Sequence, residues 1–155
     1  MTALRIDVAD LLARPSARRS LHVEARLADL ASSTVQIPEE EPVVVDVLLE
    51  RIPDGIVVRG TVHTVWRAHC SRCLTELERP LELLVNELYE FDPVEGDTYP
   101  IENEHVDLEL VVRDSVLLEL PLVPVCPTDC VEPAPTDLAE APPDPRWAAL
   151  SELDL

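Results

Sequence analysis

Four stretches of the chain alternate apolar and polar residues with a period of two, which is typical of half-buried β-strands. They cover residues 21–28, 43–51, 56–68 and 77–91. A turn with Pro53 at its second position and Gly55 at its fourth separates the second stretch from the third. Because strands and helices do not alternate as they do in a parallel sheet, the pattern predicts an antiparallel sheet. It would be built from hairpins or a meander, with a barrel-like arrangement as an open alternative.

A single longer segment has helical character. Asp107 is placed to cap a helix that runs to Leu120 and stops at Pro121, with apolar residues at helical spacing. Its Val and Leu content would also permit a strand, but the cap, the length and the proline favour a helix. We therefore expect an α+β domain in which one helix packs on the sheet.

The remaining segments of this region are expected to be short elements and loops. Residues 4–6 predict a short strand, and residues 7–13 predict a helical turn capped by Asp7. Residues 36–42 carry consecutive glutamates between two prolines, and residues 92–104 are acidic and polar. Both compositions predict exposed loops.

The third and fourth strands are expected to form a hairpin with one apolar face, which ends at Phe91, and one charged face. The charged positions before the turn are mainly basic and those after it mainly acidic: Arg59, His63, Arg67 and His69, then Glu78, Glu82, Asn86 and Glu90. The basic set alone would suit phosphates. If the strands pair, however, opposite charges face each other, at about 0.2–1 kcal/mol a pair. Both interpretations stay open, and we expect Arg67 and Arg72 to be the least neutralised.

Cysteines form two close pairs. Cys70 and Cys73 lie at the predicted hairpin tip, and Cys126 and Cys130 follow the predicted helix. Two such pairs can bind one Zn²⁺, which accepts four thiolates tetrahedrally. A four-cysteine site leaves no position for water, so the zinc would be structural and not catalytic. The spacing predicts that a four-cysteine zinc site cross-links residues 1–130 into one domain.

Other states of these cysteines remain as alternatives. Two disulfides would need an oxidising compartment, whereas the chain opens without an apolar signal segment, so we expect a reducing cytoplasm. A redox-active pair would need a βαβ context that the pattern lacks. Unliganded core thiols are the third alternative. His105 is a further candidate zinc ligand, whereas His22 lies on the polar side of its strand and is expected to face solvent.

Charge narrows the range of partners. The net charge is −19, all 12 basic residues are arginine, and residues 1–36 are nearly neutral. Such a field repels nucleic-acid backbones and attracts basic proteins. No apolar run approaches the roughly 20 residues that span a bilayer, so we expect a soluble protein without a membrane partner. No motif indicates a small-molecule substrate.

The C-terminal part has a different composition. Residues 131–143 are acidic and rich in Pro and Ala, as in a flexible linker. Residues 144–155 open with Asp-Pro and predict a short helix. A helix of this length is not stable alone in water. Its apolar residues are therefore expected to dock on the domain itself or on a partner: Trp147, Leu150 and Leu153.

Several blocks of sequence together carry a family resemblance. They are Arg5-Ile6-Asp7-Val8-Ala9-Asp10-Leu11-Leu12, Cys70-Ser71-Arg72-Cys73-Leu74, Leu120-Pro121-Leu122-Val123-Pro124-Val125-Cys126 and Asp144-Pro145-Arg146-Trp147-Ala148-Ala149-Leu150. In this combination the chain resembles the YceD family of bacterial large ribosomal RNA subunit accumulation proteins. The resemblance implies a role in ribosomal RNA maturation or large-subunit assembly, and it implies no biochemical activity. Many relatives have a further Cys-Pro-x-Cys-Gly segment where this chain has Val131-Glu132-Pro133-Ala134-Pro135.

The sequence leaves three classes of function to compare: an enzyme, a ribosome-biogenesis factor and an acidic chaperone or scaffold. An enzyme is disfavoured, because the chain lacks a Gly-rich phosphate loop, Gly-x-Ser-x-Gly and His-Glu-x-x-His. We expect a non-enzymatic ribosome-biogenesis factor that acts through a ribosomal, assembly or RNA-processing protein. Large-subunit ribosomal RNA is a second candidate partner, contacted through Arg67, His69 and Arg72. The alternative is an acidic chaperone or scaffold for a basic protein, without direct RNA binding.

Overall fold

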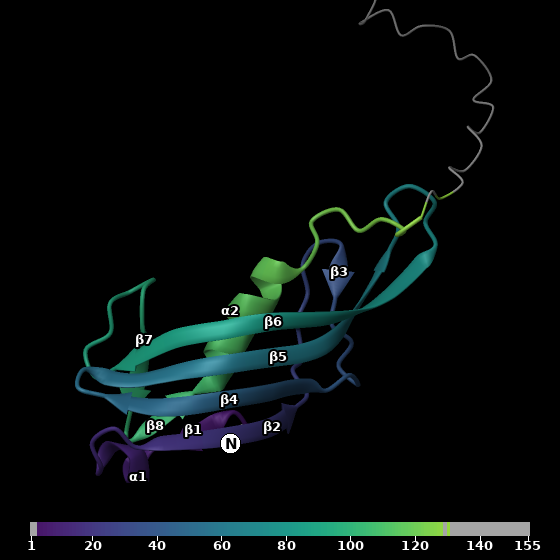
Figure 1. The fold of residues 1–155 in the computed structure, drawn as a ribbon. Helices are drawn as coiled ribbons and strands as arrows, with labels where there is room; N and C mark the ends of the chain where they lie inside the picture. Colours follow the sequence, from purple (N-terminus) through teal and green to yellow (C-terminus); the bar gives the residue numbers. More distant parts are fainter. Residues whose placement is uncertain (1–2, 129, 131–155) are drawn as a thin grey trace, which may run out of the picture.

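The computed structural model describes residues 3–128 and 130, and its main element is a curled, half-barrel β-sheet (Figure 1). Seven strands follow the order β1-β8-β7-β6-β5-β4-β2, and β3 pairs with β5 off this path. The strands are β1 (Arg5–Asp7), β2 (Arg18–Ala25), β3 (Val35–Gln36), β4 (Val43–Ile52), β5 (Gly55–His69), β6 (Glu76–Glu90), β7 (Tyr99–Glu102) and β8 (His105–Asp107). The described helices are α1 (Ala9–Leu12) and α2 (Leu108–Glu119), and α2 crosses one face of the sheet.

Helix α2 forms where the sequence predicts it. The Asp107 carboxylate accepts a hydrogen bond of 2.9 Å from the Glu109 backbone N–H, which satisfies one of the free donors at the helix start. The helix ends at Glu119, and the C-cap residue Leu120 has an extended backbone before Pro121. The side of the helix that is buried in the core carries Leu108, Val111, Val112 and Val116. The predicted helix and its packing are confirmed.

The hairpin of β5 and β6 is the longest unit of the sheet and also confirms its prediction. Its register places His63 opposite Glu82 and Arg67 opposite Glu78. Alternate residues of both strands are buried in the core, and Tyr89 is fully buried with its hydroxyl 2.9 Å from the Asp107 carbonyl oxygen. Strand β4 approaches β5 closely at Gly60, where an added Cβ atom would collide with a backbone oxygen of β4. The hairpin therefore positions one charged face and one buried face, as the alternation indicates.

The prediction for the first long strand is displaced along the chain. Strand β2 starts at Arg18 and ends at Ala25, so the predicted range 21–28 begins and ends three residues too late. Arg18 lies opposite Glu50 of β4, and its Nη2 atom is 2.6 Å from the Glu50 Oε1 atom. The first residue of the strand thus forms an ion pair across the sheet. A search for alternating apolar residues does not find such a charged strand start.

The region after β6 contains strands that the sequence prediction missed. Residues 92–104, predicted as a loop, include β7 and lead into β8. The four predicted strands pair antiparallel, as expected, but the unpredicted strand β7 runs parallel to β6, with Tyr99 opposite Tyr89, so the sheet is mixed. Strands of three or four residues are too short to show a period of two. Phe91, predicted on the apolar face, lies just beyond β6 and is 61% exposed.

Smaller differences concern the segment before β4 and the N-terminus. Residues 36–42 are not wholly an exposed loop, because β3 includes Gln36 and because Ile37 and Pro38 are buried. Asp7 is the last residue of β1, and its carboxylate accepts a 2.9 Å hydrogen bond from the Ala9 N–H at the start of α1. The predicted linker 131–143 and C-terminal helix 144–155 lie outside the described residues. Neither described helix is long and apolar enough to cross a membrane.

Candidate metal centre

The structure brings the four predicted cysteines together at the far end of the β5–β6 hairpin. Cys70 and Cys73 lie in the turn between the strands, and Cys126 and Cys130 come from the segment after α2. The Sγ atoms of Cys70 and Cys130 are 3.8 Å apart, and those of Cys73 and Cys126 are 3.5 Å apart. All four sulfur atoms lie within 4.8 Å of one another, and the cysteines are free. This arrangement is compatible with a metal site.

Backbone hydrogen bonds fix the turn that carries the first pair. The Cys70 N–H donates to the Thr75 carbonyl oxygen at 2.8 Å, and the Leu74 N–H donates to the Cys70 carbonyl oxygen at 2.9 Å. Leu74 adopts a φ of 61°, in the left-handed region that tight turns use. The Ser71 N–H donates to the Pro124 carbonyl oxygen at 2.8 Å, which connects this turn to the lead-in of the second pair.

The sulfur geometry fits a tetrahedral ion. With Zn–S bonds of about 2.3 Å, the sulfur atoms of a tetrahedral site are about 3.8 Å apart. The two sulfur–sulfur distances of this cluster are close to that value. The Arg72 N–H also lies 3.5 Å from the Cys70 sulfur, where it stabilises a thiolate. The donor set and its spacing therefore suit a thiophilic divalent cation.

Ionisation differs between the two cysteine pairs. Backbone N–H groups of Cys73 and then Arg72 lower the pKa of the Cys70 thiol to about 6, and hydrogen bonds to Thr75 lower the pKa of Cys73. Hydrogen bonds with Cys73 and Cys70 raise the pKa of Cys126 to about 12, and burial raises the pKa of Cys130. The thiols of the first pair therefore ionise more readily than those of the second. A divalent cation at the centre would favour ionisation of the second pair as well.

The two histidines weighed as ligands lie elsewhere. His105 is on β8, opposite Asp7, and its Nδ1 atom is 2.7 Å from the Asn103 carbonyl oxygen. It is not part of the cysteine cluster, so its prediction as an alternative ligand is wrong. His22 lies on β2 with its side chain 60% exposed and its Nδ1 atom 2.5 Å from Asp46 Oδ1. Its predicted solvent-facing position is confirmed.

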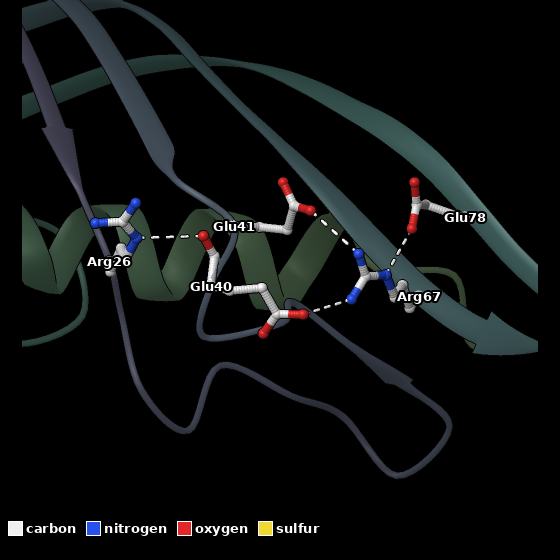
Figure 2. A network of polar contacts seen from close by, with 5 residues as sticks. All are labelled: Arg26, Glu40, Glu41, Arg67 and Glu78. Carbon is white, nitrogen blue, oxygen red and sulfur yellow. Dashed lines mark hydrogen bonds and ion pairs between the residues drawn. The ribbon is translucent and has the colours of Figure 1, made fainter.

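Arg67, next to the metal centre on β5, is held by three carboxylates (Figure 2). Its nitrogens lie 2.6 Å from Glu40, 3.1 Å from Glu41 and 2.6 Å from Glu78. The Arg26 Nε atom also donates to the Glu40 carbonyl oxygen at 3.2 Å, which holds the loop that carries Glu40 and Glu41. The expectation that Arg67 would be little neutralised is wrong. Sequence spacing missed Glu40 and Glu41 because they reach the hairpin from a distant loop.

The other two residues predicted to contact RNA are in different surroundings. His69 is the exposed last residue of β5 and lies opposite Glu76. Arg72 is exposed in the turn between the two cysteines of the first pair. Neither takes part in the ion pairs found among the described residues, in contrast to Arg67. An RNA contact through these three residues stays a prediction.

Comparison with known proteins gives consistent matches. The family model "Large ribosomal RNA subunit accumulation protein YceD" matches residues 58–154. An uncharacterized protein of Mycobacterium tuberculosis is 30% identical over 97% of this chain and 81% of its own length. The uncharacterized protein YlbN of Bacillus subtilis is 29% identical over 55% of this chain and 49% of its own length. No solved structure matches. The match from β5 to the C-terminal region, which includes all four cysteines, shows that this chain belongs to the YceD family.

Proposed function

We propose that this protein is a non-enzymatic factor that supports the accumulation of large-subunit ribosomal RNA during ribosome assembly and acts through a protein partner. The observation that carries this proposal is the family match, which runs from residue 58 to residue 154. It includes most of the β5–β6 hairpin, helix α2 and all four cysteines. The matched region therefore contains the whole candidate metal centre.

Charge supports a protein partner over RNA as the main contact. The chain carries a net charge of −19, which opposes approach to a phosphate backbone. On the charged face of the hairpin, Arg67 already binds three carboxylates, and the Nδ1 atom of His63 is 3.7 Å from Glu82. A phosphate would have to displace these carboxylates. A basic ribosomal protein or an RNA-processing enzyme is electrostatically favoured instead.

Direct RNA contact, as a secondary interaction, would be confined to the edge beside the first cysteine pair. This edge consists of Arg67, His69 and Arg72. Arg72 is the strongest candidate of the three, because it is exposed and takes part in no ion pair among the described residues. The limited size of this edge predicts weak binding of the isolated protein to RNA.

We further propose that the four cysteines bind one Zn²⁺ as a closed structural centre. The support is the sulfur spacing of 3.5 and 3.8 Å and the all-thiolate donor set. A bound ion would connect the hairpin turn to the segment after α2. Elemental analysis of protein purified without chelator should give one zinc per chain. Metal-free protein with four reduced thiols would contradict this assignment.

The same charge also favours the alternative function, an acidic chaperone or scaffold for a basic ribosomal protein or RNA-processing enzyme, without direct RNA binding. The two functions differ in their response to ribonuclease. A pull-down from native lysate in treated and untreated arms separates associations that require RNA from those that do not. The chaperone function predicts the same captured proteins in both arms.

The RNA edge can be tested with charge-reversed variants. Arg72→Glu should weaken the ribonuclease-sensitive association, whereas Arg14→Glu, an equal charge change at an exposed residue after α1, should leave it intact. A gel shift with precursor large-subunit RNA, beside co-sedimentation with assembly particles, completes the comparison. Tight, salt-sensitive binding to naked RNA would contradict the protein-partner proposal. Absence from ribosomal precursors in every arm would reject the role in assembly.

A further inference from the structure

Helix α2 has a second apolar side that no described element covers. Its buried side packs in the core, but three leucines lie on the opposite side: Leu110, Leu117 and Leu118. Leu118 is 85% exposed and Leu110 is 45% exposed. In an α-helix, positions 110, 114, 117 and 118 share one side. An exposed apolar stripe opposite the core is typical of a surface that binds another segment.

A cavity adjoins this stripe and combines apolar and acidic walls. It has a volume of about 540 Å³ and lies between α2, β6 and the loop that leads into β7. Leu117 and Leu118 form its apolar part, and its carboxylates belong to Glu87, Asp97 and Asp114. No basic side chain is among its lining residues in the described part of the chain. The cavity thus suits an apolar group that carries a positive charge beside it.

The chain contains one segment with this combination of groups. Arg146 is followed directly by Trp147, and Leu150 comes three positions after Trp147, a spacing that would place both side chains on one side if this segment were helical. Arg146 is also the only basic residue in the sequence after Arg113. The Trp147 indole provides a large apolar surface, and the guanidinium of the adjacent Arg146 can pair with carboxylates.

The length of the chain allows this segment to reach the cavity. Cys126 follows Leu118 by eight positions, so the metal centre lies at most about 29 Å of extended chain from the end of α2. Residues 131–144 supply 14 positions after Cys130, which can span about 46–50 Å. The linker is therefore long enough to return from the metal centre to α2.

We propose that residues 145–153 of this chain dock on the exposed side of α2. Trp147 enters the cavity beside Leu117 and Leu118, and Arg146 pairs with the acidic wall. Leu150 and Leu153 continue the contact along the leucine stripe. This docking does not depend on the role in ribosome assembly, because it is an interaction within one chain.

Tryptophan fluorescence tests the docking in the full chain. The sequence has two tryptophans, Trp66 and Trp147, so the difference between the wild-type spectrum and that of Trp147→Phe reports on Trp147. We expect blue-shifted emission and weak quenching by acrylamide. Leu118→Asp should shift the emission to the red and increase the quenching. Leu84→Asp is the matched control, because Leu84 is 82% exposed but lies on β6 away from this cavity.

Charge variants and dilution complete the test. Arg146→Glu should loosen the docking and Arg146→Lys should retain it. Should the difference spectrum be too weak, Trp66→Phe leaves Trp147 as the only indole.

Red-shifted, strongly quenched Trp147 emission in the native monomer would overturn the proposal and leave the segment for a partner. A blue shift that disappears on dilution would overturn it in favour of a second copy of the chain. Equal effects of Leu118→Asp and Leu84→Asp would also overturn it.

Discussion

The body and the tip of the β5–β6 hairpin are stabilised in different ways. In its body, between Ile56 and Trp66, alternate side chains are buried against the other strands and α2. At its tip, residues 70–75, Cys70 is the only buried residue. The body is therefore stabilised by apolar burial, whereas most of the tip is exposed and the proposed metal would act there as a cross-link. This contrast indicates why four cysteines gather at the tip, where hydrophobic packing is not available.

The largest expected effect comes from the tip. Cys70→Ser should abolish stoichiometric zinc binding, because structural sites require all four ligands and contribute about 10–16 kcal/mol of apparent binding free energy. Hydrogen exchange should then rise in residues 68–78 and 122–126 and stay slow in β4. Mass spectrometry of exchange with and without chelator measures this. Uniform loss of protection across β4 as well would show that the sheet beyond the hairpin tip also depends on the metal.

The core into which the body packs should respond to loss of apolar volume. Leu49 on β4 is fully buried, so Leu49→Ala should lower the free energy of unfolding by about 2–5 kcal/mol. Leu84→Ala, at an exposed position on β6, should change it by less than about 0.5 kcal/mol. Urea unfolding of the zinc-loaded protein provides the comparison. Equal costs at the two positions would contradict the assignment of the core.

Arg67 lies at the junction of body and tip, and its removal should have a smaller effect. Two hydrogen bonds lower the pKa of the Glu40 carboxyl group. The first comes from the backbone N–H of Glu40 itself, and the second comes from the Arg67 side chain. Because the pKa of Glu40 is lower in the folded state, its ionised form stabilises the fold at pH values above the ordinary pKa of 4.5. This stabilisation is lost as the pH falls through the folded-state pKa. The destabilisation by Arg67→Ala should therefore be greater at pH 7 than at pH 3. The same destabilisation at both pH values would argue against the carboxylate contacts.

The smallest expected effect concerns strand β2, at the end of the strand order and away from the hairpin. The hydrogen bond to Asp46, and then its charge, raises the pKa of His22 above its ordinary value of 6.5. The protonated His22 therefore stabilises the fold fully below pH 6.5. This stabilisation disappears as the pH rises through the folded-state pKa of His22. NMR titration should show the raised pKa in the wild type and a lower pKa in Asp46→Asn. An unchanged titration in that variant would rule out Asp46 as the cause.

Sequence reasoning succeeded where one local pattern determines the structure. The β5–β6 pairing follows from long alternation, α2 follows from its Asp107 cap and the proline after it, and the cysteine cluster follows from paired spacing. The two strands and the helix are encoded within short segments, and the cysteine cluster is encoded in the spacing of two close pairs. Their prediction needed no knowledge of distant contacts.

Features that depend on distant contacts were missed. Strands β7 and β8 are short and are stabilised by pairing with β6 and β1, which periodicity does not reveal. The three-carboxylate environment of Arg67 also depends on how the loop with Glu40 and Glu41 folds back. Local charge patterns could identify Glu78 as one partner, but they could not identify the other two.

The role in ribosome assembly is tested most directly in cells that lack the protein. The ratio of large-subunit to small-subunit ribosomal RNA should fall in these cells and return with the wild-type chain. The Cys70→Ser variant, expressed at the same level, should restore the ratio less well, because the candidate metal centre lies within the family-matched region. An unchanged ratio in cells without the protein would contradict the proposed function.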